Sequence, residues 1–170
     1  IQSSSIIVHG FSHRYYSKKT ELTPDTAYGK SKLLADDIII ASGCKASILR
    51  IGGIFGDNGS LHLGINKAIV EAKKGNPPNI VNTGSAKRNY IFVKDVALAI
   101  IDTVKERLTG IHYLGGETKT IKSMLNDICD VFIPGNQPEY IEGQEAVDQL
   151  IEPCNNFKIT PFRLALEEMV

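Results

Sequence analysis

The sequence predicts an α/β fold built on a parallel β-sheet, and two observations carry this prediction. Short apolar segments, several of them closed by glycine, alternate with segments of helical length and helical periodicity. Hydrophobic residues make up 42% of the 170 residues, enough for a real core, and neither an internal repeat nor a low-complexity linker interrupts the alternation. Strands that alternate with helices in this way are typical of parallel sheets covered by helices.

The elements are predicted in order along the chain. Ile1–Gly10 is predicted as a buried strand centred on Ile6-Ile7-Val8, and the polar residues 11–22 as a surface loop. Thr23-Pro24 predicts a helix start, because a hydroxyl N-cap precedes a proline at the first helical position, and Gly43 predicts its end. Further strands are expected at 47–51, 79–82, 89–93 and 111–114 and weakly near 140, and further helices at 61–74, 95–107, 121–131 and from 161.

Charge and cysteine content exclude several classes of function. The 19 basic and 19 acidic residues cancel, which predicts no binding of nucleic acid and no binding of an anionic membrane surface. No apolar run is long enough to span a bilayer. Cys44, Cys129 and Cys154 form no metal-ligand pattern, so we expect free thiols in a cytoplasmic protein and no metal site.

Tyr28 and Lys32 are the strongest candidates for chemistry. Four residues apart on a helix, they project from one face, and an ammonium beside a phenol favours the ionised form of that phenol. Such a tyrosine can exchange a proton with a hydroxyl or carbonyl oxygen while hydride moves to or from a nicotinamide. Ser3-Ser4-Ser5, at a strand end, can supply a hydroxyl donor beside the reacting oxygen. The same spacing also occurs on ordinary exposed helices, so the surrounding segments must show whether the pair is catalytic.

Five segments in order resemble the extended short-chain dehydrogenase/reductase family, the NAD-dependent nucleotide-sugar epimerases, dehydratases and reductases. They cover about residues 1 to 130 and comprise 3–10, 24–32, 48–56, 88–97 and 110–117. The resemblance implies the C-terminal portion of a Rossmann-like doubly wound parallel sheet plus a small α/β substrate-binding domain. Residues 1–60 would hold the catalytic serine and the Tyr-x-x-x-Lys helix. Residues 61–170 would be mainly substrate-binding, with 89–110 returning to the Rossmann sheet.

The resemblance also implies roles for individual residues. Ser5 matches the catalytic hydroxyl, Tyr28 the acid/base, and Lys32 the lysine that also holds the nicotinamide ribose. Gly53 and Ile54 fall in the loop under the nicotinamide. Arg88 matches an arginine that binds the substrate diphosphate, a task that suits its guanidinium fork; a surface ion pair is the alternative for it. Asn66 is a candidate for substrate contact or, alternatively, part of a solvated helix face.

The chain departs from the family pattern in four respects. The Gly-x-x-Gly-x-x-Gly segment that binds the dinucleotide is not found, so we expect the N-terminal half to be absent and the isolated fragment to be inactive. Ile6 and Ile7 stand where sugar 4,6-dehydratases carry an Asp-Glu pair, which disfavours dehydration. His9 replaces a tyrosine common in the family and suits either a substrate contact or a packed side chain. Gly53 replaces an asparagine that contacts the nucleotide sugar in many epimerases.

The sequence therefore predicts an NAD(P)-dependent nucleotide-sugar epimerase or keto-sugar reductase with a Ser-Tyr-Lys site. Two rivals remain open: a catalytically silent binding or regulatory relative, and a reductase of a non-sugar carbonyl. The choice between NAD and NADP is also open, because the residue that reads the ribose lies outside these segments. We expect a homodimer in the full-length enzyme, with Leu33, Ile38 and Ile40 of the catalytic helix suited to the contact.

Overall fold

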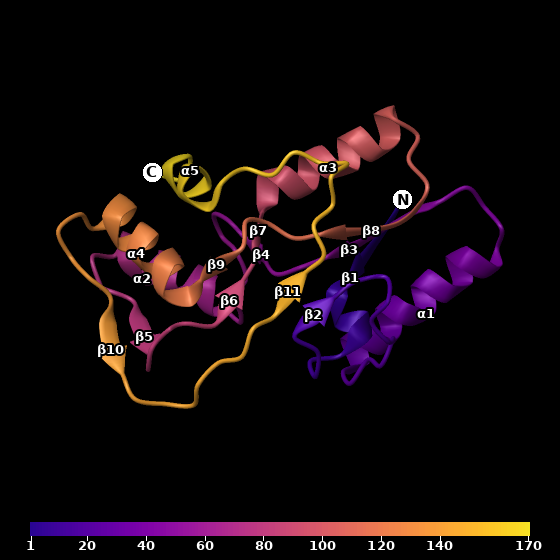
Figure 1. The fold of residues 1–170 in the computed structure, drawn as a ribbon. Helices are drawn as coiled ribbons and strands as arrows, with labels where there is room; N and C mark the ends of the chain where they lie inside the picture. Colours follow the sequence, from indigo (N-terminus) through magenta and orange to yellow (C-terminus); the bar gives the residue numbers. More distant parts are fainter.

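Three parallel strands form the central sheet of the computed structural model, which describes residues 1–170. They are β1 (Gln2–Ser5), β3 (Ser47–Ile51) and β8 (Gly110–Leu114), in the order β1-β3-β8. Ser5 pairs with Ile51 and Ile51 with Leu114, so the carboxyl ends of the three strands share one edge. Helices α1 (Ala27–Ala41) and α3 (Val93–Lys105) lie on opposite sides of this sheet (Figure 1).

Side chains alternate between the two faces of the sheet, as the pleat requires. Leu49 and Ile51 point toward α3 and join its Val96 and Ala99 in one apolar cluster. Arg50, between them, reaches Asp36 of α1 on the other face. The sheet is therefore held by apolar packing on one side and by a buried polar contact on the other.

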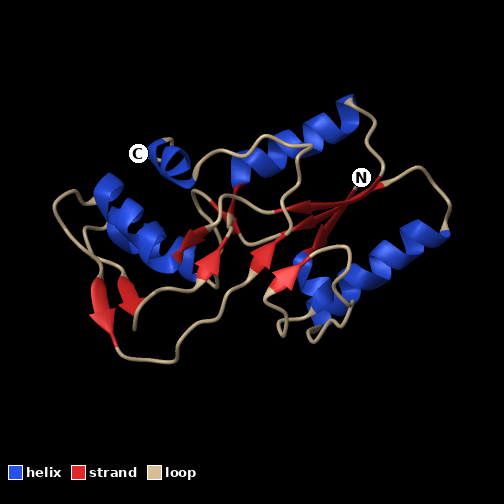
Figure 2. Ribbon diagram, in the orientation of Figure 1, coloured by secondary structure: helices blue, strands red, loops and turns tan.

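A second region is built from helices around its own apolar core. Helices α2 (Gly64–Lys73), α4 (Ile121–Phe132) and α5 (Phe162–Glu167) pack with the parallel pair β5 (Asn79–Val81) and β10 (Glu139–Ile141). Its core contains the buried side chains of Phe55, Met124, Ile128, Phe162 and Leu166. This region lies beside the central sheet in Figures 1 and 2.

Three pairs of two-residue strands lie outside the central sheet and the β5–β10 pair. The parallel pair β4 (Ile54–Phe55) and β7 (Ile91–Phe92) carries the chain between the two regions. The antiparallel pair β6 (Lys87–Arg88) and β9 (Lys119–Thr120) lies near α4, and β2 (Tyr15–Tyr16) pairs with β11 (Leu150–Ile151). A short 3₁₀ helix, η1 (Ile6–His9), follows β1 directly.

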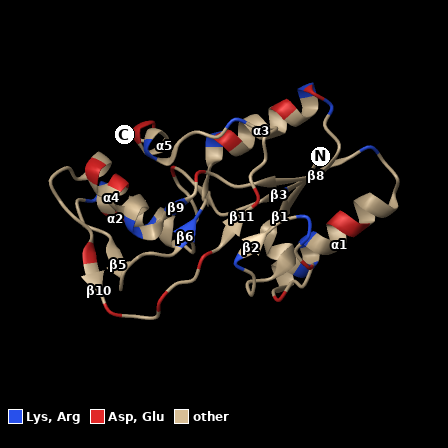
Figure 3. Cartoon of the chain, in the orientation of Figure 1, with Lys and Arg blue, Asp and Glu red and all other residues tan.

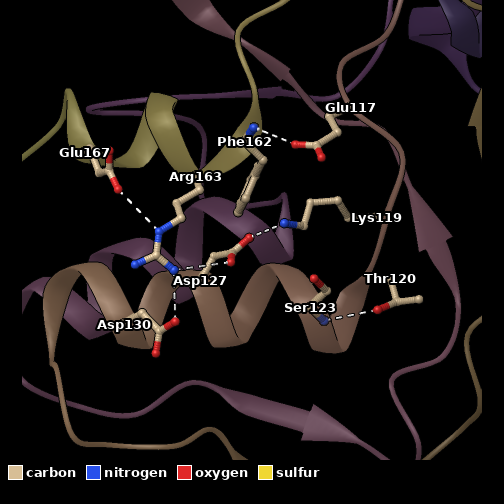
Figure 4. Close-up of polar contacts among 9 residues, drawn as sticks. All are labelled: Glu117, Lys119, Thr120, Ser123, Asp127, Asp130, Phe162, Arg163 and Glu167. Atoms are coloured by element: carbon tan, nitrogen blue, oxygen red, sulfur yellow. Dashed lines mark hydrogen bonds and ion pairs between the residues drawn. The ribbon is translucent and has the colours of Figure 1, made fainter.

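The C-terminal helix α5 is fixed to α4 by charged side chains, as Figure 4 shows. Arg163 Nη1 donates to Asp130 Oδ2 at 3.0 Å and its Nε to Glu167 Oε1 at 3.3 Å, while Lys119 pairs with Asp127 of α4. Glu117 Oε2 accepts from the backbone N of Phe162 at 2.8 Å and satisfies an otherwise unpaired amide of the first turn of α5. These contacts bury Phe162 and Leu166 against the helical core.

Acidic and basic side chains are mixed over the elements (Figure 3). This distribution agrees with the formal net charge of zero. No helix combines the length and the apolar character that crossing a membrane requires.

The structure confirms the strands at 47–51 and 111–114 and corrects two predictions near the N-terminus. The first strand is Gln2–Ser5; Ile6–His9 form η1 instead, because Ser5 Oγ accepts from the backbone N of Ile7 and turns the chain. Helix α1 begins at Ala27, since Thr26 Oγ1 accepts from Gly29 N at 3.0 Å. Thr23, the predicted cap, instead donates to the carbonyl oxygen of His9.

The predicted loop at 11–22 is also more ordered than its polarity indicates. It contains β2, and the side chain of Tyr16 is buried in a small cluster with Tyr113 and Ile151. The partner strand β11 lies far along the sequence, so no local sequence pattern predicts that it pairs with β2.

A buried ion pair joins α1 to the sheet. Arg50 Nε lies 3.3 Å from Asp36 Oδ2, and the exposed fractions of the two side chains are 5% and 0%. Ser4 Oγ donates to the same carboxylate oxygen at 2.9 Å, and Arg50 Nη1 donates to the hydroxyl of Tyr113 at 2.8 Å. Each charge thus gains further hydrogen bonds, which such a buried pair needs to offset its desolvation.

Replacing Asp36 with alanine is expected to lower the free energy of unfolding by about 3–5 kcal/mol, because Arg50 is left buried without a counter-charge. Urea titration followed by circular dichroism measures this. The matched control is Asp37→Ala, the exposed neighbour on the same helix, which should change stability by no more than about 0.5 kcal/mol. Equal losses for the two variants would contradict a structural role for the pair.

Candidate active site

Ser5 ends strand β1 and is almost fully buried. Its Oγ accepts from the backbone N of Ile7 at 3.3 Å and serves as the N-cap of η1. A hydroxyl oxygen that accepts this bond still has its O–H free to donate. Ser5 is therefore a fixed hydroxyl donor at the carboxyl edge of the sheet.

Gly29 allows α1 to approach η1 closely. A Cβ at this position would lie 2.8 Å from the carbonyl oxygen of Ile7 and 3.1 Å from both Ile7 Cγ2 and Pro24 Cβ. Because Tyr28 precedes Gly29 in the first turn of α1, this close approach places Tyr28 beside the segment that Ser5 caps.

Lys32 connects Tyr28 to the serine segment. Its Nζ lies 5.6 Å from the centroid of the Tyr28 ring and donates to the carbonyl oxygen of Ser3 at 2.9 Å. Tyr28 is 54% exposed, so its ring is open to a ligand at this edge. The structure thus brings together Lys32, Tyr28 and the Ser3–Ser5 segment, which the sequence analysis had linked only by resemblance and spacing.

His9 lies fully buried behind this group. Its Nδ1 is 2.8 Å from the carbonyl oxygen of Glu21, an acceptor only, so Nδ1 carries the proton. Its Nε2 is 2.9 Å from the hydroxyl of Tyr113, which already accepts from Arg50 and therefore donates to His9. His9 is a packed member of the buried polar network, the second of the two roles that its position suggests.

Gly53 and Ile54 follow β3 at the same edge of the sheet. A Cβ at Gly53 would lie 2.7 Å and 2.9 Å from two carbons of the Tyr90 ring, so this ring covers the space that a side chain would fill. Ile54 opens β4 and packs partly buried against the apolar cluster of the central sheet. Contacts of Gly53 to a ligand on this side would therefore use its backbone.

Arg88 is held at a defined position on β6. Its Nη1 donates to the carbonyl oxygens of Val147 at 2.5 Å and of Lys87 at 2.8 Å. Both bonds use Nη1, which leaves the Nε–H and Nη2–H groups for an anionic ligand.

Asn66 is 2% exposed and binds backbone groups only. Its Nδ2 donates to the carbonyl oxygens of Ile54 and Ser60, and its Oδ1 accepts from Gly56 N. The glycine-rich loop at 56–60 folds around this amide, and Gly59 must lack a side chain to admit it. In this structure Asn66 holds the loop that leads from β4 to α2.

A cleft of about 460 Å³ opens between α2 and α4, a feature that the sequence reasoning missed. Its apolar wall includes Ile65, Ala68, Met124 and Leu125, and the ring of Tyr90 also lines it. Its polar lining comes from the following residues: Lys67, Glu71, Asn76 and Asn79. Ile65, Lys67, Ala68 and Glu71 lie on α2, Met124 and Leu125 lie on α4, and Asn76 and Asn79 follow α2 in the chain. Only the packing of the two helices shows that these residues face one space.

Burial lowers the pKa of His9 from its ordinary 6.5; the Glu21 carbonyl opposes this shift and the charge of Arg50 adds to it. Burial also raises the pKa of Tyr113, against the effect of Arg50. Both shifts favour the neutral forms that the hydrogen-bond directions require. The structure holds no group of three or more His, Cys, Asp or Glu side chains suited to a metal ion.

The model of the NAD dependent epimerase/dehydratase family matches residues 1–114 of this chain. No curated protein sequence matches the chain significantly.

Solved structures of similar fold include three sugar-nucleotide enzymes. A UDP-N-acetylglucosamine 4-epimerase from Methanobrevibacter ruminantium M1, in complex with UDP-N-acetylmuramic acid, gives a TM-score of 0.79 at 24% identity over 99% of this chain and 60% of its own. A UDP-N-acetylglucosamine 4-epimerase from Bacillus cereus gives 0.80 at 21% identity over 98% and 62%. A dTDP-glucose 4,6-dehydratase from Bacillus anthracis str. Ames, in complex with NAD, gives 0.75 at 21% over 99% and 59%.

These likenesses confirm the Rossmann-like α/β fold. The chain spans about three fifths of the length of the solved structures it matches.

A methyl group at Gly29 is expected to lower the free energy of unfolding by about 1–3 kcal/mol, although alanine is the better helix former. The reason is the overlap with the backbone of Ile7, which forces α1 away from η1. Gly64→Ala is the matched control, because Gly64 opens α2 and a Cβ there meets nothing within 4 Å. Thermal unfolding of both variants tests this, and equal stability of the two would refute the close approach.

Stability is expected to fall on acidification through His9. Because the pKa of His9 is lower in the folded chain, the unfolded chain binds more protons below pH 6.5, and the free energy of unfolding decreases as pH falls through that value. Urea titrations at about pH 7.5 and about pH 5.5 should show a smaller pH-dependent loss for His9→Gln than for the wild type. His62→Gln, in an exposed segment, should lose as much stability between these pH values as the wild type does. If His9→Gln also loses as much as the wild type, His9 is not the cause of the pH dependence.

Proposed function

This chain belongs to the NAD dependent epimerase/dehydratase family, and we propose that it carries the acid–base half of the active site of a nucleotide-sugar epimerase or keto-sugar reductase. The observation that supports this most directly is the grouping of Tyr28, Lys32 and the Ser3–Ser5 segment at the carboxyl edge of a parallel sheet. This edge is where open α/β sheets bind their ligands.

Tyr28 is proposed to move the proton. In the oxidation direction its phenolate takes the proton of a substrate hydroxyl as the hydrogen on the same carbon leaves as hydride, and in the reduction direction the phenol returns a proton to the carbonyl oxygen. Ser5 donates a hydrogen bond to that oxygen and holds it next to Tyr28. Lys32 places its positive charge beside the Tyr28 ring, where it can offset negative charge that develops as the proton moves.

The residues present suit NAD or NADP as the cofactor. Lys32 Nζ uses one N–H on the carbonyl oxygen of Ser3 and keeps two for ribose hydroxyls, and the exposed ring of Tyr28 leaves room for a planar group beside it. We propose that Gly53 and Ile54 contribute contacts from the end of β3. When bound, the cofactor accepts or donates the hydride.

The helical region is proposed to hold the nucleotide sugar. Arg88 keeps its Nε–H and its Nη2–H groups free for a diphosphate. The cleft between α2 and α4 offers apolar walls with amide and charged groups, which suits a nucleoside. Asn66, buried under the glycine-rich loop, is proposed to act indirectly by fixing that loop rather than by touching the substrate. The UDP-sugar enzymes of similar fold support this substrate class.

Epimerisation or reduction is favoured over dehydration. A dehydratase must protonate the hydroxyl that leaves, and the two residues after Ser5, Ile6 and Ile7, carry no ionisable group. An epimerase oxidises and reduces one carbon and leaves its cofactor unchanged, whereas a reductase consumes reduced nicotinamide. The absorbance of reduced nicotinamide during turnover of a nucleotide sugar therefore separates the two.

The exposed face of α1 is proposed to join two copies of the chain in a homodimer. Ile38 and Ile40, two of the residues suited to this contact, are exposed, and so is Leu34. Leu33, the third residue predicted for the contact, is partly buried. Sedimentation of the wild type and of Ile38→Glu tests this, since a buried charge would split the dimer.

Tyr28→Phe in the holoenzyme is expected to lower kcat by at least about a hundredfold, because the group that exchanges the proton is lost while the ring remains. Steady-state kinetics with UDP-N-acetylglucosamine and UDP-glucose measures this. The matched control is Tyr15→Phe, an exposed tyrosine on β2, which should keep the wild-type rate. Full activity of the Tyr28 variant would disprove the mechanism and favour a relative that binds without catalysis.

A further inference from the structure

The ring of Tyr90 lies over Gly53 at the junction of the two regions. A Cβ on Gly53 would approach the ring to 2.7 Å, closer than packed atoms come, so the ring occupies this place only because residue 53 has no side chain. Leu63, at 3.6 Å from the same point, closes the other side. The side chain of Tyr90 is thus positioned by a gap at Gly53.

The backbone around Tyr90 is held on both sides. Ile91 N donates to the carbonyl oxygen of Gly53, and Gly116 N donates to that of Asn89, each at 2.9 Å. The Asn89 side chain makes two more bonds to the backbone of Ile151. A Cβ on Gly116 would overlap the carbonyl oxygen of Tyr90, so residue 116 must also lack a side chain. The segment therefore presents Arg88 and Tyr90 with little freedom.

Tyr90 lines the cleft and follows Arg88 by two residues in the chain. Its neighbours between α2 and α4 are Ile65, Ala68 and Met124. Burial raises the pKa of Tyr90, and the charge of the Arg88 guanidinium opposes this shift. The phenol therefore stays protonated at neutral pH, and it lies near enough to Arg88, the cation proposed to bind the diphosphate, for that charge to act on it.

We propose that Tyr90 is a substrate-binding residue that donates its phenol hydrogen to a phosphate oxygen of the nucleotide sugar, beside Arg88. This inference rests on the proposed function and deepens it. A neutral O–H next to a guanidinium gives an anionic oxygen a second donor without a second desolvated charge. The bare Gly53 is what admits this donor, so the two positions act as one determinant of specificity.

Tyr90→Phe removes only the hydroxyl and keeps the packing on Gly53. In the holoenzyme we expect it to weaken the binding of UDP, and of dTDP, about tenfold or more, because a hydrogen bond to a charged group is lost. Binding of uridine, which has no phosphate, should change by less than about twofold. Isothermal titration with the three probes measures this, and KM for UDP-N-acetylglucosamine should rise while kcat stays close to the wild-type value.

Two further variants keep the test sharp. Tyr140→Phe, an exposed tyrosine on β10, is the matched control and should bind UDP as the wild type does. Gly53→Ala should weaken UDP binding because the new methyl group displaces the ring of Tyr90. In the Tyr90→Phe background the same change should weaken UDP binding by less than a further factor of about two, since no hydroxyl is left to displace.

The outcomes are distinct. Unchanged UDP affinity in Tyr90→Phe, with normal wild-type binding, overturns the role of Tyr90 and leaves the proposed function standing. Equal weakening of UDP and uridine also overturns it, because the loss would then lie in the nucleoside part. A wild type that binds neither UDP nor dTDP overturns the proposed function, and the inference with it.

Discussion

The buried pair of Asp36 and Arg50 is the contact on which the rest of the structure depends. Helix α1 has an exposed apolar face and little apolar surface turned to the sheet, so its position cannot come from hydrophobic packing alone. The pair, with Ser4 and Tyr113 bound to it, specifies how α1 is rotated on the sheet. Because Tyr28, Lys32 and Asp36 follow at intervals of four on one helix face, this rotation also sets the direction of Tyr28 and Lys32, the side chains proposed to be catalytic.

Close approach is the second constraint, and glycine provides it at the positions that matter. Gly29 brings α1 against η1, and Gly53 admits the ring of Tyr90. In each case a methyl group would separate a proposed functional side chain from its place. The absence of a side chain at Gly29 and Gly53 therefore fixes how closely the neighbouring elements pack.

Much of the fold and part of the candidate site could be predicted from the sequence. The features that could not be predicted depend on tertiary contacts. The strands at 47–51 and 111–114 were predicted because apolar runs closed by glycine are local signals. The start of α1 was wrong because Thr23 and Thr26 are equally good caps, and only tertiary bonding chooses between them. The Asp36–Arg50 pair and the cleft were missed because they join side chains of different elements. Burial of Asn66 was missed for the same reason, since its partners are backbone groups of a folded loop.

The two cations near the candidate site, Arg50 and Lys32, differ in whether a carboxylate compensates their charge. Arg50 lies behind the Ser3–Ser5 segment, but Asp36 compensates its charge within 3.3 Å, and both are buried. Lys32, in contrast, makes no salt bridge and holds only a neutral carbonyl, that of Ser3. The uncompensated positive charge next to the Tyr28 ring is therefore that of Lys32. Helix α1 thus carries Asp36, whose charge is compensated by Arg50 and which fixes the position of the helix, and one turn earlier Lys32, whose charge has no counter-ion. The contact that holds the helix on the sheet is therefore separate from the charge beside the Tyr28 ring.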